Sequence, residues 1–229
     1  MKKVYFLSGT MNDERLWQWV FPKLEQLIPV YIDITPAKSF EAINELIADA
    51  IDEEGILIGF SLGGFSALNF TLKFPGKVSK LMMICAAADG LNEEEVRLRK
   101  STIHFLESHN YKGISATRIQ QFVHPKARNY TAIAALIREM DATLGKDTLI
   151  RQLKATSERK SLMDKVAMLT MPVFLLGASH DLLVNPDSME DMYLELENAS
   201  FEIISETGHM IPLEQPEILA HKIHHFVFS

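Results

Sequence analysis

The stretch Gly55-Ile56-Leu57-Ile58-Gly59-Phe60-Ser61-Leu62-Gly63-Gly64 decides the fold of this chain. An apolar run leads into a serine flanked by glycines, and a segment with helical character follows at residues 65–74. Glycines two positions before and two positions after Ser61 leave the space that a sharp strand-to-helix turn requires. The pattern predicts a buried strand, a tight turn with Ser61 at its tip, and a helix.

Such a turn is suited to a nucleophile. It places the serine hydroxyl above the edge of the sheet and directs the first N–H groups of the helix toward the space beside it. The partial positive charge of a helix N-terminus stabilises a developing oxyanion there. Ser61 is therefore the predicted nucleophile, and the backbone N–H of Leu62 is the first predicted oxyanion donor.

A nucleophilic serine needs a base and a carboxylate that orients the base, and two later loops provide them. The apolar run at residues 172–177 is typical of a buried parallel strand, and Asp181 follows it. A last short strand is expected at 201–205, and His209 follows that one. The chain order serine, acid, histidine is the order expected for this type of turn.

Some alternatives stay open at these positions. Asp181 can also be interpreted as a capping or turn residue, and His209 as a surface-loop histidine. Asp89 is the reserve acid, because it directly follows the apolar run that ends at Ala88. The single cysteine, Cys85, is expected inside a strand as a small core residue, with no disulfide partner.

With these motifs the chain resembles the α/β-hydrolase superfamily over nearly its whole length. The resemblance rests on the opening strand with Ser8-Gly9, on the turn at Ser61, on the Asp181 loop with Pro186 beyond it, and on Gly208-His209 with Glu214 and Pro216 following. It implies a mostly parallel sheet with helices on both faces and an active site over the carboxyl ends of the strands.

The resemblance also implies a second oxyanion donor in the loop after the opening strand. This is the N–H of Thr10, next after Gly9, with Met11 as the neighbouring alternative. Many relatives have His-Gly where this chain has Ser8-Gly9. The acid loop also differs, because three residues separate Gly177 from Asp181 where two are more usual.

Alternating strand and helix patterns predict an α/β fold, a doubly wound, mostly parallel sheet of about six strands with a helical lid inserted after the fourth strand. Strands are expected at 3–8, 30–34, 55–60, 80–87, 172–177 and 201–205, and helices at 14–27, 40–52 and 62–74. Amphipathic helices at 93–108, 115–122, 128–143 and 147–157 form the predicted lid. The predicted domains are a core of residues 1–89 and 161–229 and a lid of residues 90–160.

Composition narrows the class of protein. With 229 residues, of which 47% are hydrophobic, the chain can form one good core. The net charge of -7 argues against nucleic acid as a partner, and it disfavours strongly anionic substrates unless a local patch of Lys and Arg offsets the field. No segment has the length of a signal peptide core or a membrane span, so a cytoplasmic protein is expected.

These observations predict a serine hydrolase that cleaves a small carboxylic ester or thioester through an acyl-enzyme on Ser61. The expected partner is a small-molecule substrate with an apolar acyl part, and neither a metal nor an organic cofactor is required. Three alternatives remain: a C–C bond hydrolase or lyase with the same fold, a non-catalytic receptor that binds a ligand, and a purely structural module. The sequence indicates no oligomeric state.

Overall fold

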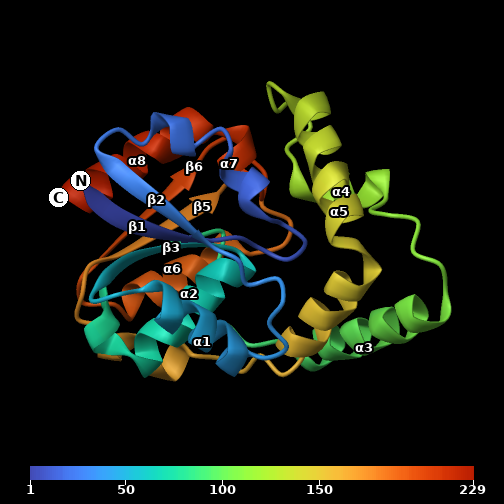
Figure 1. Cartoon of the computed structure of the whole chain (residues 1–229), viewed down its shortest axis with the longest axis horizontal. Helices are drawn as coiled ribbons and strands as arrows, with labels where there is room; N and C mark the ends of the chain where they lie inside the picture. Colours follow the sequence, from blue (N-terminus) through green and yellow to red (C-terminus); the bar gives the residue numbers. More distant parts are fainter.

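In the computed structural model, which describes residues 1–229, six parallel strands form one sheet in the order β2-β1-β3-β4-β5-β6 (Figure 1). The strands are β1 (Lys2–Leu7), β2 (Leu27–Ile32), β3 (Gly55–Phe60), β4 (Val78–Ile84), β5 (Val173–Ala178) and β6 (Ala199–Ile204). Every residue of β3 and β5 is buried, as expected of inner parallel strands covered on both faces. The predicted fold class is confirmed.

Helices cover both faces of the sheet, and each face has its own hydrophobic core. One core includes apolar residues of α1 (Phe40–Ala50), α2 (Leu62–Lys73) and α6 (Pro186–Leu194). The other includes residues of α7 (Ile211–Glu214) and α8 (Pro216–Phe228). Because all six strands are parallel, their carboxyl ends meet at one edge, where the loops that carry Ser61, Asp181 and His209 begin.

Three helices occupy the chain between β4 and β5: α3 (Glu93–Ser108), α4 (Ala116–Phe122) and α5 (Tyr130–Thr156). They stand together beside the sheet, at the right in Figure 1. Apolar residues of α4 and α5 join the same core as α8, so this α3–α5 segment is packed onto the rest of the chain. The division into core and lid at residues 90 and 160 stays a prediction.

The segment 14–27 is not the predicted helix. It contains two short 3-10 turns, η1 (Glu14–Trp17) and η2 (Phe21–Lys23), and β2 then begins at Leu27. Pro22 lies inside the expected helix, and a proline removes a helical hydrogen bond and clashes with the preceding turn. Pro29 inside β2 is tolerated because β2 is an edge strand.

The helices expected at 128–143 and 147–157 are both present, on either side of a kink inside α5 at Gly145, whose φ of 70° and ψ of 178° are not helical. One further predicted boundary is wrong. The strand expected at 80–87 ends at Ile84, because Cys85 adopts a φ of 47° and takes the chain out of the extended conformation. Cys85 therefore lies in the loop after β4, not inside the strand. No helix combines the length and the apolar character that crossing a membrane requires.

Candidate active site

Ser61 lies at the tip of the turn between β3 and α2, with φ 53° and ψ −116°. This conformation is strained for a residue with a side chain. The two glycines of the motif permit the turn: a Cβ on Gly59 would lie 2.3 Å from the carbonyl oxygen of Gly63, and one on Gly63 would lie 2.4 Å from that of Leu7. The Ser61 N–H donates to the Ile84 carbonyl at 2.9 Å, which ties the turn to the end of β4.

A continuous chain of hydrogen bonds joins the three predicted triad residues. The Ser61 Oγ lies 3.1 Å from His209 Nε2, and His209 Nδ1 lies 2.7 Å from Asp181 Oδ2. The His209 and Asp181 side chains are 4% and 2% exposed, so their interaction is shielded from water. Residues 148 positions apart in sequence are thereby brought into direct contact.

Asp181 also caps its own loop. Its Oδ1 accepts hydrogen bonds from the N–H groups of Leu183 and Val184, at 2.8 and 3.0 Å. Burial by itself would raise the pKa of Asp181, but the hydrogen bond and charge of His209, together with these two N–H groups, hold it below the ordinary value. Asp181 is therefore both a turn aspartate and the partner of His209, and the two interpretations do not exclude each other.

Glu214 holds the loop that carries His209. Its carboxylate accepts from the N–H groups on either side of that histidine, those of Gly208 at 3.0 Å and Met210 at 3.1 Å. It also accepts from the His124 N–H at 3.0 Å, at the end of α4. Burial raises the pKa of Glu214 despite these three donors. The resemblance included Glu214 after Gly208-His209, but the contact of Glu214 with His124, 90 positions away, forms only in the folded chain.

The two candidate oxyanion donors in the loop after β1 differ in their hydrogen bonds. The Met11 N–H donates at 2.9 Å to Oε1 of Gln152 on α5, whereas the Thr10 N–H donates to no protein group. The Leu62 N–H is the first of α2, and the first N–H groups of a helix have no intrahelical acceptor. The Thr10 N–H is thus free of any protein acceptor, as the predicted oxyanion donor requires, whereas the Met11 N–H is occupied.

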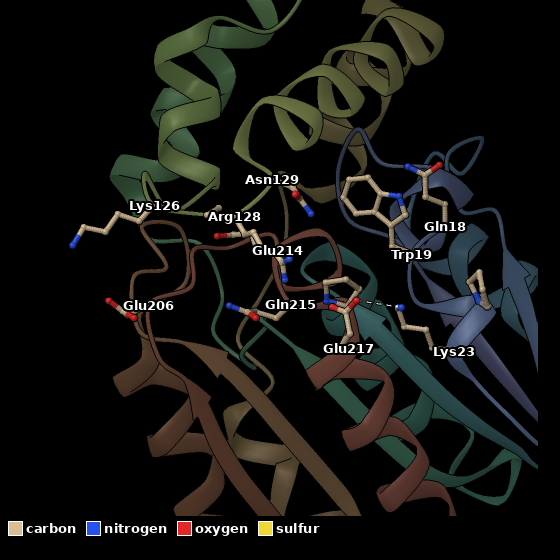
Figure 2. A pocket seen from close by; sticks show the side chains of 13 residues that line it. Gln18, Trp19, Lys23, Lys126, Arg128, Asn129, Glu206, Glu214, Gln215 and Glu217 are labelled. Carbon is tan, nitrogen blue, oxygen red and sulfur yellow. Dashed lines mark ion pairs between the residues drawn. The ribbon is translucent and has the colours of Figure 1, made fainter.

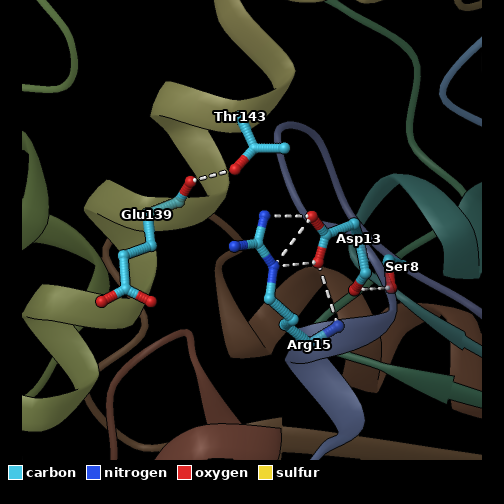
Figure 3. Close-up of polar contacts among 5 residues, drawn as sticks. All are labelled: Ser8, Asp13, Arg15, Glu139 and Thr143. Atoms are coloured by element: carbon cyan, nitrogen blue, oxygen red, sulfur yellow. Dashed lines mark hydrogen bonds and ion pairs between the residues drawn. The ribbon is translucent and has the colours of Figure 1, made fainter.

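Ser8 stabilises that loop in the place where many relatives have histidine. Its hydroxyl donates to the Asp13 carbonyl at 3.1 Å and accepts from the Trp17 indole at 3.0 Å. Figure 3 shows Ser8 and Asp13 side by side, with the Arg15 guanidinium paired to the Asp13 carboxylate. This network, absent from the sequence argument, fixes the path of the chain from β1 into η1.

Cys85 lies close to Asp181 and His209, and one potential ligand atom of each lies within 4.8 Å of the others. Burial, and then the charge of Asp181, raise the pKa of the Cys85 thiol well above its ordinary value. A protonated, fully buried thiol is a poor nucleophile and a poor metal ligand. Asp89, the reserve acid, is half-buried and makes no hydrogen bond to His209, whose carboxylate partner is Asp181.

A separate hollow is lined by residues that include Trp19, Arg128 and Glu206 (Figure 2). It has a volume of about 740 Å³ and is lined mostly by polar residues, including an ion pair between Lys23 and Glu217 at 3.2 Å. None of Ser61, Asp181 and His209 lines it. Glu214 borders it, but both of its carboxylate oxygens are occupied by backbone N–H groups.

Comparisons with known proteins agree with this fold. A family model described as the alpha/beta hydrolase fold matches residues 26–216. A pimeloyl-[acyl-carrier protein] methyl ester esterase of Neisseria meningitidis is 24% identical, over 99% of this chain and 94% of that protein. The AB hydrolase superfamily protein YclE of Bacillus subtilis is 26% identical, over 93% of this chain and 85% of that protein. A thermophilic esterase from Thermogutta terrifontis superposes with a TM-score of 0.88 at 21% identity, covering 100% of this chain and 90% of that one.

Proposed function

The chain belongs to the alpha/beta hydrolase fold family, and from that premise we propose that it is a serine esterase with Ser61, His209 and Asp181 as its catalytic residues. One observation carries the proposal: the unbroken hydrogen-bond chain from the Ser61 hydroxyl through the His209 ring to the Asp181 carboxylate. Ester hydrolysis is also the activity for which several similar proteins are named.

The first half-reaction forms an acyl-enzyme. As the Ser61 Oγ attacks the ester carbonyl, its proton passes to His209 Nε2, and the Asp181 carboxylate stabilises the resulting imidazolium. The N–H groups of Leu62 and Thr10 stabilise the negative charge on the carbonyl oxygen. The tetrahedral intermediate then breaks its bond to the leaving oxygen, which receives the Ser61 proton from His209 and departs as the alcohol.

The second half-reaction restores the enzyme. His209 removes a proton from a water molecule, which attacks the acyl group on Ser61 through the same oxyanion geometry. Collapse of this intermediate releases the carboxylic acid and returns the proton to Ser61. We propose that the α3–α5 segment acts as a lid, because Gln152 on α5 and Phe122 at the end of α4 bond to the loops that carry the oxyanion donor and His209.

The test is reaction of the protein with a fluorophosphonate probe, followed by turnover of short 4-nitrophenyl esters. We expect the probe to label Ser61 of the wild-type protein. Ser61→Ala should not be labelled, and its kcat should be lower by a factor on the order of a million. Ser66→Ala is the matched control, because Ser66 is a buried serine one turn along the same helix with no hydrogen-bond partner. Near-normal turnover by Ser61→Ala would refute the assignment.

The same panel separates the remaining alternatives. A C–C bond hydrolase or lyase would react with the probe but turn over esters and thioesters poorly. A receptor would show a ligand-induced rise in melting temperature with negligible turnover. Efficient hydrolysis of the esters, abolished by Ser61→Ala, would exclude all of these alternatives, and also a purely structural module.

A further inference from the structure

Two arginines lie where the α3–α5 segment meets the rest of the chain. Arg99 is on α3, and Arg159 follows the end of α5. Both are half-buried, yet none of the ion pairs of the structure includes either of them. Charged groups withdrawn from water are normally paired, so two unpaired guanidinium groups require an explanation.

The two arginines are neighbours through Thr156. The Arg99 guanidinium donates to the Thr156 hydroxyl. The backbone N–H of Arg159 donates to the backbone carbonyl of Thr156 at 3.2 Å. Burial lowers the pKa of both side chains, and the charge of Arg99 lowers that of Arg159 further. Both nevertheless stay charged, because a guanidinium group is not deprotonated in proteins. The site is therefore a fixed pair of positive charges.

The carboxylates of the surroundings do not neutralise this pair. Glu95 and Asp89 act on Arg159 only through their more distant charges, since neither forms an ion pair with it. The Glu95 carboxylate accepts from the Asn92 N–H at 2.8 Å, where it caps the start of α3. The two guanidinium groups are thus without a direct carboxylate partner, in a chain whose net charge is -7.

The pair is connected to two elements of the proposed site. The Arg159 guanidinium lies 4.7 Å from the centroid of the Phe65 ring, and Phe65 follows Ser61 by one turn of α2. The Thr156 hydroxyl donates to the carbonyl of Gln152, whose side chain accepts from the Met11 N–H in the loop after β1. The arginines therefore contact the helix that begins after Ser61 and the turn of α5 that holds this loop.

Two buried N–H donors in this region have no acceptor. They are Nε of Arg159 and Nε2 of Gln152, and neither atom is accessible to solvent or bonded to protein. A buried donor without an acceptor is costly, and its presence in a native structure points to a group that binds there. An ionised carboxylate has several acceptor positions and the charge that both guanidinium groups require.

We propose that Arg99 and Arg159 form a subsite for a carboxylate at the far end of the acyl part, so that the substrate is a monoester of a dicarboxylic acid. This inference rests on the proposed esterase function. The acyl part is the half of the substrate that stays bonded to Ser61, next to the helix that carries Phe65. These two local positive charges would attract an anionic substrate despite the negative net charge of the protein.

The experiment compares monomethyl esters of linear dicarboxylic acids, from succinate to suberate, with methyl esters of monocarboxylic acids of equal chain length. We expect the wild-type protein to prefer one of the dicarboxylic monoesters. Arg159→Met should lower kcat/KM for that ester by about 10- to 100-fold, mainly by raising KM. A loss of this size is expected when one charge-assisted hydrogen bond is removed. The uncharged ester should change by less than about twofold, and Arg159→Lys should recover part of the loss.

Arg138→Met is the matched control, because Arg138 is an exposed arginine of α5 that bonds only to its own helix. It should leave both classes of ester unaffected. Equal losses on charged and uncharged esters in Arg159→Met, or a wild-type protein that does not favour the charged esters, would overturn the subsite. Failure of the esterase proposal is distinguishable, since it would abolish turnover of the uncharged esters and labelling of Ser61 as well.

Discussion

Gly59→Ala should damage both the stability and the activity of this protein. A Cβ at this position would lie 2.3 Å from the Gly63 carbonyl oxygen, 2.5 Å from the Gly63 carbonyl carbon and 2.5 Å from the Gly64 Cα. All three atoms are backbone, so no side chain can move aside. Reaching the ordinary contact distance of 3.4 Å requires the first turn of α2 to shift by about 1 Å relative to β3.

That shift sets the magnitude of both effects. Forcing an extra carbon into a packed interior costs about 1–3 kcal/mol, and backbone neighbours place this case at the upper end. Because Ser61 lies between the two displaced elements, its hydroxyl should move relative to His209 by a similar distance. A misplacement of about 1 Å in a reacting group lowers the rate by roughly 100-fold.

The assay combines urea unfolding, followed by the fluorescence of the buried Trp17, with kcat/KM for a short ester. Gly76→Ala is the control, since a Cβ there meets nothing within 4 Å and its φ is not positive. The control should unfold with an unchanged or slightly higher free energy, by up to about 1 kcal/mol. If Gly59→Ala matches the wild type in both measurements, the steric account of the turn is wrong.

Two further predictions concern the buried neighbours of His209. Asp181→Asn should lower kcat by about 10⁴-fold, because His209 loses the group that fixes its tautomer, and a loss below tenfold in steady-state assays would contradict that role. The pKa of Asp181 is lowered by folding, so its ionised form stabilises the native state above the ordinary carboxyl pKa of about 4, and this contribution disappears as the pH falls through the lower native value. The wild type should therefore exceed Asp181→Asn in unfolding free energy by a smaller amount below that pH, as measured by urea titration. A difference that stays constant with pH would contradict the lowered pKa of Asp181. Cys85→Ala should retain kcat within about threefold, since its protonated thiol takes no part in the proposed chemistry; turnover abolished in a folded Cys85→Ala protein would instead identify the cysteine as the nucleophile.

Local sequence signals sufficed for the parts of the fold that depend on neighbouring residues. The apolar runs before Ser61 and Asp181 predicted β3 and β5 to within a residue, because inner parallel strands are apolar throughout. The helix predicted at 14–27 does not form, because Pro22 cannot donate a helical hydrogen bond and clashes with the preceding turn. The strand at 80–87 was too long, because nothing in its composition marks the positive φ of Cys85.

The sequence by itself therefore determined the fold class, the turn at Ser61 and the chain order of Ser61, Asp181 and His209, since these follow from short-range sterics and strand patterning. Only the tertiary structure decided which distant groups meet. It bonds Gln152 of α5 to Met11, joins Glu214 to His124 and assembles Arg99 with Arg159 around Thr156. These contacts depend on how the α3–α5 segment packs onto the sheet, and packing between segments far apart in the chain leaves no periodic signal in the sequence.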